Sequence, residues 1–386
     1  MTSTSGRSAV AGVLSAVAVA LAAGRASAHV QYVTDPGAAA VDAVAFAVET
    51  LSEPLNAALL GGGAATVALA LAVAVYTRPT IPDIEALRAT LSGYREYIPW
   101  MLRLSLGLPL IGAGFIGYLF SPVVEVTGPL LGGVLSGSLL GDLLGLFLSV
   151  RVFQVGLGFL LLVGLATRAT AAVGLLSYLV AFAFEPGLIL AVEYVPGFVA
   201  LVLVGSGRPS ADHMLQEVAS TPGTYYGRVD PVHGLAERFA ALVAPARRYV
   251  PTVLRVGLGV AFAYLGLVEK LANPSRALEV VAKYDLTAVV PVDPGLWVLG
   301  AGLTEIGVGL LLVVGLYTRG AAAVAFSMLV LTLFGLPDDP VLAHVTLFGM
   351  LSAVFTLGAG PLSLDALLAA ADRRERADPE SATVAD

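Results

Sequence analysis

Long apolar runs constrain this chain more than any other feature of its sequence. They recur from residue 56 onward, and runs of roughly 17–25 residues cross about 30 Å of hydrocarbon as an α-helix. Backbone groups in lipid must be satisfied within the spanning segment, so an open-ended span is helical. With 57% hydrophobic and 13% charged residues, the chain has too little polar surface for a soluble globule. The sequence therefore predicts an all-α polytopic membrane protein.

The spacing of these runs predicts nine membrane-spanning helices. The predicted spans are 56–76, 98–121, 148–166, 169–185, 187–205, 250–271, 295–316, 320–336 and 341–360. Arginines concentrate in alternate loops and in the C-terminal tail, and cytoplasmic loops of membrane proteins are enriched in Lys and Arg. We therefore expect a multi-pass protein of the cell membrane, with the mature N-terminus outside and the C-terminus in the cytoplasm.

The N-terminus has the layout of a secretory signal peptide. Arg7 precedes an apolar run that closes on the small residues Ala26-Ser27-Ala28, as at a cleavage site. An uncleaved signal anchor is the competing interpretation, which Arg25 favours. Cleavage leaves His29 as the first residue, where an α-amine and an imidazole form a chelating pair suited to copper. His29 is therefore a candidate metal ligand.

Part of the sequence is written twice. The paired stretches are "LRLSLGLPLIGAGFIGYLFSP" (102–122) with "LRVGLGVAFAYLGLVEKLANP" (254–274), "FQVGLGFLLLVGLATRA" (153–169) with "TEIGVGLLLVVGLYTRG" (304–320), and "GSGRPSAD" (205–212) with "GAGPLSLD" (358–365). The offsets of the three pairs lie between 151 and 153 residues. Each copy holds four spans, an even number, so both copies run in the same direction. We predict two tandem four-helix transmembrane bundles in parallel orientation, plus one extra N-terminal span.

These features divide the chain into six segments. The predicted segments are a signal peptide or anchor at 1–28, an extracytoplasmic stretch with one span and an inner loop at 29–97, the first repeat at 98–215, a cytoplasmic linker at 216–249, the second repeat at 250–368 and a tail at 369–386. The tail sequence "DRRERADPESATVAD" is polar, which predicts disorder in the cytoplasm.

Charged residues lie within the predicted spans of the second repeat. A charge at membrane depth costs at least ~2.5–3.5 kcal/mol, so each one needs a partner or a function. Counted at 1.5 Å per residue, Glu305 lies roughly 21 Å from Arg319, and Lys270 lies roughly 22 Å from Arg255. His344 lies just inside the outer end of its span. All three reach the outer third of the bilayer from different helices, and we predict that Lys270 pairs with Glu305.

Three interpretations of these residues remain open. In the first, Glu305 and His344 exchange protons with a redox carrier, Lys270 sets their charge state, and Glu269 lies near the outer boundary. In the second, the pair only locks helix packing, and Lys270 or Glu269 extends to the lipid headgroups. In the third, the group binds a metal ion. The first repeat keeps polarity but little charge at or near the same positions, with Tyr118, Gln154 and Glu193.

The second repeat resembles the DoxX family of four-helix membrane proteins. The resemblance rests on "LRVGLGVAFAYLGLVEKLANP", then "EIGVGLLLVVGLYTRGAA", then a span that begins "LAHVTLFG" and ends "GAGPLSLD". It covers 250–368 well and 98–215 more weakly. The family includes a subunit of thiosulfate:quinone oxidoreductase, so the resemblance implies membrane-associated electron transfer, in some members coupled to sulfur compounds.

The absence of cysteine limits the cofactors. It excludes Cys-ligated iron–sulfur clusters, covalent haem attachment and thiol catalysis. Redox chemistry would then use another bound cofactor or a diffusible quinone, with the redox centre on a partner subunit. No basic patch for nucleic acid is present, so the expected partners are membrane lipids and a redox subunit. A non-enzymatic membrane scaffold and a transporter of small molecules or metal ions are the alternative functions.

Overall fold

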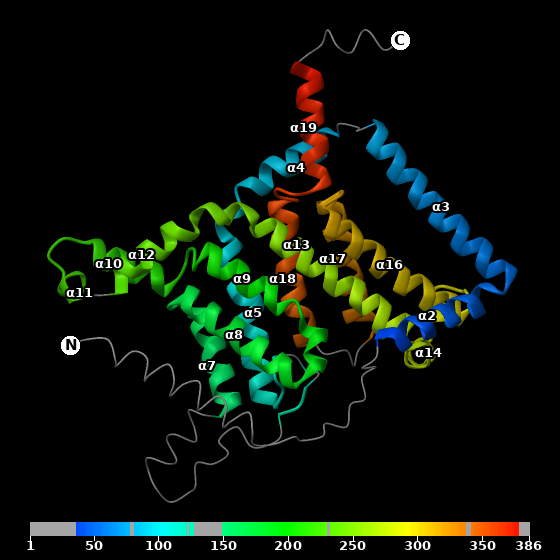
Figure 1. The fold of residues 1–386 in the computed structure, drawn as a ribbon, viewed down its shortest axis with the longest axis horizontal. Helices are drawn as coiled ribbons and strands as arrows, with labels where there is room; N and C mark the ends of the chain where they lie inside the picture. Colours follow the sequence, from blue (N-terminus) through cyan, green and yellow to red (C-terminus); the bar gives the residue numbers. More distant parts are fainter. Residues whose placement is uncertain are drawn as a thin grey trace, which may run out of the picture. The chain divides into compact units, whose positions relative to one another are not determined.

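Helices make up almost all of the described chain, which in the computed structural model comprises residues 36–77, 81–120, 122, 124–126, 149–229, 232–336 and 341–377. Within these residues the β-type pairing is one isolated bridge between Tyr118 and Glu125. Gly37–Asp386 forms one compact unit (Figure 1), and all nine predicted spans lie within it. The predicted signal peptide and His29 lie outside the described residues.

Apolar helices occupy all nine predicted spans. Six described stretches are long and apolar enough to cross a membrane: α3 (Pro54–Thr77), Arg95–Ile116 with α5 (Ile98–Ile116), α8 (Thr167–Phe184), Gly234–Leu271 with α13 (Val250–Tyr264), α16 (Pro294–Val314) and α17 (Thr318–Gly335). Three apolar helices are shorter: α7 (Val150–Val163), α9 (Tyr194–Val204) and α18 (Val341–Leu357). The protein is therefore an all-α, multi-pass membrane protein.

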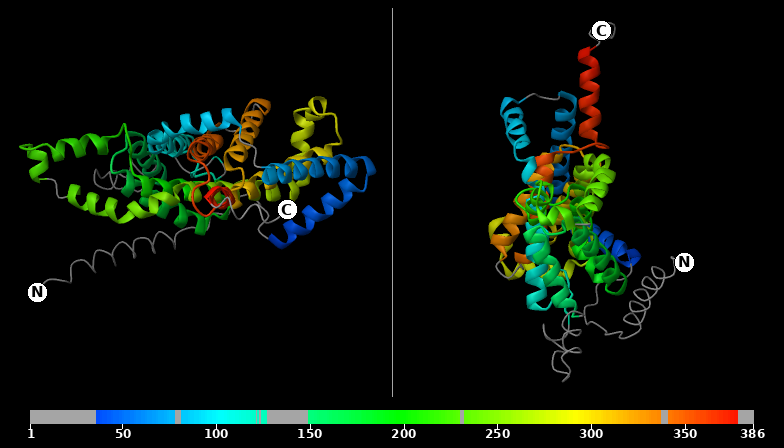
Figure 2. Two further views of the ribbon diagram at one scale, coloured as in Figure 1. Left: turned by 90° about the horizontal axis from the view of Figure 1, so that it is seen from above. Right: turned by 90° about the vertical axis from the view of Figure 1, so that its left-hand side faces the viewer.

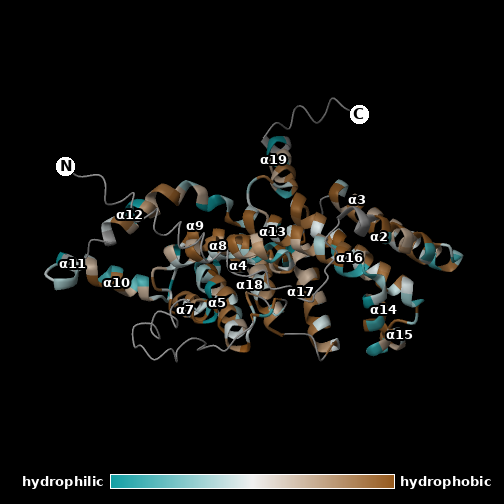
Figure 3. Cartoon of the chain, turned by 60° about the horizontal axis from the view of Figure 1, so that its bottom comes forward, coloured by the Kyte–Doolittle hydropathy of each residue, from teal (hydrophilic) through white to brown (hydrophobic). Residues whose placement is uncertain are grey.

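Eight further α-helices flank these nine in the described residues. They are α2 (Pro36–Leu51), α4 (Pro82–Ser92), α10 (Ala211–Ser220), α11 (Tyr225–Val229), α12 (Val232–Val243), α14 (Pro274–Lys283), α15 (Leu286–Val289) and α19 (Leu364–Ala377). Figure 3 shows hydrophobic residues dominating α13 and α17, whereas α10, α11 and α14 carry hydrophilic ones. The prediction of a disordered tail at 369–386 is wrong for residues 369–377, because α19 continues to Ala377, and the rest of the tail lies outside the described residues. The run of Ala, Arg and Glu in α19 consists of good helix formers.

Four helices form the centre of the fold. α5 and α13 each pack against both α9 and α18, and the views of Figures 1 and 2 show these helices together. α5 and α18 run antiparallel, since a Cβ added at Gly112 would meet Leu342 and one added at Gly349 would meet Ser105. Around this centre α7 packs on α5, α8 on α9, α16 on α13 and α17 on α18. We call α5, α7, α8 and α9 the first helical set, and α13, α16, α17 and α18 the second.

A buried arginine closes the same end of each helical set. Arg103 and Arg255 are each 1% exposed and lie 152 residues apart. Arg103 donates hydrogen bonds to the carbonyl oxygens of Leu161, Leu162, Ser206 and Pro209. Arg255 donates to those of Leu312, Val313, Ala359 and Leu362. Each guanidinium thereby satisfies carbonyls that the helix ends leave without an intrahelical partner.

An aspartate caps a turn beside each of these arginines. The Asp365 carboxylate accepts hydrogen bonds from the backbone N–H groups of Tyr317 and Thr318, at 2.8 and 3.0 Å. Asp212 accepts equivalent bonds at the start of α8. The turn needs Gly315 at φ +70°, where an added Cβ would also strike Ser363 and Arg255. A carboxylate at a helix N-terminus stabilises the helix through its free N–H groups and its dipole.

Candidate functional site

Lys270 and Glu305 form the predicted pair. Lys270 Nζ lies 2.7 Å from Glu305 Oε1, and the two side chains are 29% and 15% exposed. Lys270 follows α13, and Glu305 lies in the middle of α16. Counting residues from Arg255 and Arg319 placed both charges at the same depth, because the rise of a helix is nearly constant. The contact confirms that estimate.

A π-helix positions Lys270. α13 runs on without a break into η4, a π-helix over Leu265–Leu271, and the backbone N–H of Ala272 donates to Leu267 O at 2.8 Å. π-helices are rare and often occur at functional sites. Nothing in the pattern of apolar residues predicts this one, since the hydrophobicity of the run is the same for either kind of helix.

Two glycines let the helices that carry the pair approach each other. A Cβ added at Gly266 would lie 2.6 Å from Gly302 O and 3.0 Å from Glu305 Cβ. A Cβ added at Gly302 would meet the Leu271 side chain at 2.7 Å. Small residues of this kind allow close contact between helices in membranes. The short approach of η4 to α16 brings the ammonium within hydrogen-bond distance of the carboxylate.

The second carboxylate oxygen of Glu305 is buried and has no hydrogen-bond partner among the described residues. Buried polar atoms in proteins nearly always have a partner, because leaving one unsatisfied costs about 1–3 kcal/mol. Glu305 Oε2 is thus an acceptor that can take a proton or a hydrogen bond from a ligand. Beside it, the ammonium of Lys270 can donate further hydrogen bonds.

The first helical set fills the equivalent place without an ion pair. Gln154 lies 151 residues before Glu305, and Tyr118 lies 152 residues before Lys270. The Gln154 side chain donates to Leu110 O and Tyr118 O at 3.0 and 3.1 Å, and accepts from the Phe120 N–H at 2.9 Å. Its amide is therefore fully engaged in holding the end of α5. Only the second set leaves an acceptor oxygen without a partner at this position.

Glu269 and His344, the other predicted residues in 250–368, have contacts of their own. Glu269 lies 3.9 Å from Arg276, at the start of α14. His344 is buried on α18, and its ring centroid lies 6.3 Å from that of Phe348. α16, which carries Glu305, packs on α3, α13, η4, α14 and α17, and α18 packs on α4, α5, α13 and α17, so α13 and α17 contact both helices.

No group of three or more His, Cys, Asp or Glu side chains within the described ranges is arranged to hold a metal ion. His29, the predicted metal ligand, lies outside the described residues. Glu193, which the sequence places near the position equivalent to His344, is buried at the start of α9. An aromatic cluster that no sequence pattern indicates surrounds it. In this cluster Tyr178 OH donates to Leu188 O, and Tyr194 OH donates to Phe120 O.

A match to a known protein family lies in the second half of the chain. Residues 250–338 match the model of the DoxX family. The matched stretch contains both Lys270 and Glu305, and it ends before His344. No curated protein and no solved structure matches the chain. The chain is thus a multi-pass membrane protein with a DoxX-like segment that carries the candidate site.

Proposed function

We propose that the Lys270–Glu305 pair handles protons at a quinone site in a membrane redox complex. The observation that carries this proposal is the buried Glu305 Oε2, which lacks a partner in the described structure. Reduction of a quinone to a quinol takes up two electrons and two protons. Glu305 takes up a proton at Oε2 from the aqueous phase and passes it to one quinone carbonyl oxygen, to which Lys270 donates a hydrogen bond. The second proton goes to the other carbonyl oxygen. His344 is the proposed group for the second proton.

The electrons come from a redox centre on a partner subunit in this proposal, because the chain has no cysteine for an iron–sulfur cluster or for covalent haem. A quinone is soluble in the bilayer and is a substrate here. The DoxX-like match over 250–338 supports this assignment, since the resemblance implies membrane-associated electron transfer. A sulfur compound is the donor class that the resemblance favours.

We also propose that 98–215 and 250–368 are two copies of one four-helix unit in parallel orientation. The support is that the bonds of Arg103 recur at Arg255, and those of Asp212 recur at Asp365, at offsets of 151 to 153 residues. The arginine ends of both units face the cytoplasm in this proposal, by the positive-inside rule. Lys270 and Glu305 then lie towards the outer surface.

A non-enzymatic scaffold is the second candidate function. It is favoured by Gln154, which holds α5 and α7 together at the position equivalent to Glu305 with no unsatisfied atom. If the Lys270–Glu305 ion pair only holds α13 and α16 together, the site catalyses no reaction. The two functions differ in what a neutral side chain of the same shape does at residue 305.

Replacement of Glu305 by glutamine tests the proposal. Glu305→Gln keeps the shape and the hydrogen bond to Lys270 but removes the proton carrier, so we expect quinone reduction in membranes that hold the native complex to fall by about 100-fold. Glu279→Gln, which changes an exposed carboxylate on α14, should leave the rate unchanged. A correctly folded Glu305→Gln protein with the rate of the unmodified chain would overturn the catalytic role. Flux of a solute into sealed vesicles without redox change would point to a transporter.

A further inference from the structure

Three helices between the two helical sets extend away from the packed spans. α10, α11 and α12 form this arm, as both Figure 1 and the left view of Figure 2 show. α10 begins at Ala211, shortly after α9 ends at Val204, and α12 leads through the 3₁₀-helix η3 (Ala244–Tyr249) into α13. Both ends of the arm are thus tied to spanning helices, on the side of the membrane where Arg103 and Arg255 lie.

α12 presents an apolar face that nothing in the described structure covers. Leu235, Phe239 and Leu242 recur at i, i+4 and i+7, which places them on one side of a helix. They are exposed, with Leu242 at 76%. Ala241 lies on the opposite, polar side and is also exposed. A helix surrounded by water would not gain from such a stripe, so this face is suited to an apolar medium.

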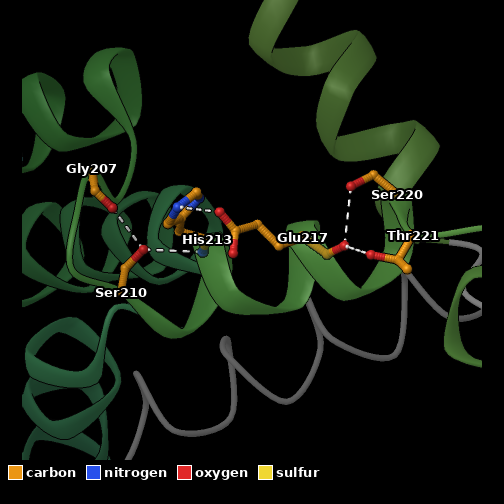
Figure 4. A network of polar contacts seen from close by, with 6 residues as sticks. All are labelled: Gly207, Ser210, His213, Glu217, Ser220 and Thr221. Atoms are coloured by element: carbon orange, nitrogen blue, oxygen red, sulfur yellow. Dashed lines mark hydrogen bonds and ion pairs between the residues drawn. The ribbon is translucent and has the colours of Figure 1, made fainter. Parts of the chain in front are cut away.

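α10 also has one polar face and one apolar face. His213 Nε2 and Glu217 Oε1 are 3.0 Å apart on its polar face, and the Ser210 hydroxyl accepts from the His213 N–H at the start of the helix (Figure 4). Met214 and Val218 lie on the other side and are exposed, Met214 at 68%. Two neighbouring helices therefore both expose apolar faces.

Exposed arginines and tyrosines lie along the arm and in η3, beside the carboxylates of Asp212, Glu217 and Glu237. Arg228, Arg238, Arg247 and Arg248 are exposed along the arm. The guanidinium of Arg248 lies 4.7 Å from the ring centroid of Tyr249, and that of Arg228 lies 6.0 Å from that of Tyr225. Arginine and tyrosine are the residues that concentrate at membrane–water interfaces, where anionic headgroups attract the cations.

We propose that α10 and α12 lie in the membrane surface, with Met214, Val218, Leu235, Phe239 and Leu242 inserted among the lipid headgroups and upper acyl chains. The occupant of the two apolar faces is the bilayer that the protein already spans. Chain continuity favours this occupant, because α9 and α13 hold the arm at the edge of that bilayer. An amphipathic helix binds in the interface plane through its apolar face, and the arginines of α11, α12 and η3 add attraction to anionic headgroups. The arm then fixes the orientation of α13, the helix that leads to Lys270.

The absence of cysteine allows a direct test in the full-length protein. Single cysteines are introduced by Leu242→Cys and Met214→Cys on the apolar faces, and by Ala241→Cys and Gln216→Cys on the polar faces. All four positions are exposed, so the substitutions should not disturb packing. Each variant is labelled with a nitroxide and reconstituted in vesicles of phosphatidylcholine and phosphatidylglycerol. Collision of the label with oxygen, which partitions into lipid, is compared with collision with a water-soluble nickel chelate.

We expect the ratio of oxygen to nickel collisions at residues 242 and 214 to exceed that at 241 and 216 by roughly threefold or more. Equal, water-like ratios at all four positions would overturn the proposal, because the arm would then lie free in solvent. Low accessibility of residues 242 and 214 to both reagents would also overturn it. That result would show that protein, from a second copy or a partner, covers the faces.

Discussion

Replacement of Arg255 by methionine should lower the free energy of unfolding by at least about 3 kcal/mol, since each hydrogen bond to a charged group contributes roughly 1.5–3 kcal/mol. Arg255 is buried and donates to four carbonyl oxygens at the ends of α16 and α18. Methionine fills a similar space but has no donor, so these carbonyls lose their partner together. The measurement is reversible unfolding in detergent micelles, with the midpoint temperature as a second readout.

Two matched variants complete the Arg255 experiment. Arg103→Met removes the equivalent guanidinium from the first helical set and should cost a similar amount. Arg276→Met changes an arginine whose side chain is 67% exposed, and it should alter stability by less than about 0.5 kcal/mol, as most surface substitutions do. If Arg255→Met were as mild as Arg276→Met, the arginine would not hold the helix ends together.

Loss of the lysine from the candidate site should destabilise the protein more than loss of both charges. Lys270→Met leaves the Glu305 carboxylate, only 15% exposed, without its counter-charge. Breaking a buried pair by removing one partner costs about 3–5 kcal/mol, and partial exposure of Lys270 should bring this towards about 2 kcal/mol. The double variant Lys270→Met/Glu305→Gln has no unpaired charge, so most of the stability should return.

A double-mutant cycle measures this coupling, with each single variant and the double variant unfolded under the same conditions. The pair is predicted to give a coupling energy of about 1–3 kcal/mol. A double variant as unstable as Lys270→Met alone would mean that the two charges are not coupled. The cycle reports stability, and so it separates the structural contribution of the pair from the redox role that Glu305→Gln tests.

The contact between Lys270 and Glu305 could be predicted from the sequence. Arg255 lies near the start of α13, and Arg319 lies just after the end of α16, so counting along each helix from these arginines gives Lys270 and Glu305 similar heights. The spans were predictable for a similar reason, because the thickness of hydrocarbon sets the length of an apolar run. The arginine and aspartate contacts recur at offsets of 151 to 153 residues, which supports the proposed duplication.

Other features depend on packing that the sequence pattern does not record. The π-helix at Leu265–Leu271 has the same composition as an α-helix would. Glu305 Oε2 lacks a hydrogen-bond partner because of how the backbone of η4 passes Gly302. His344 lies at a similar estimated depth, but depth says nothing about which helices are neighbours, and α18 packs on a different set from α16. The predicted disorder was wrong for residues 369–377 because polar character was weighed there without helix propensity.

Covalent labelling by a photoreactive quinone tests the proposed quinone site most directly. The purified protein in lipid is illuminated with an azido-quinone, digested, and the labelled residues are identified by mass spectrometry. If the quinone binds at the proposed site, the label lies on Leu265–Leu271 and on α16 close to Glu305. Excess unmodified quinone then abolishes this labelling. Label spread over lipid-facing helices and insensitive to competing quinone would contradict the proposal, as would competed label confined to the first helical set.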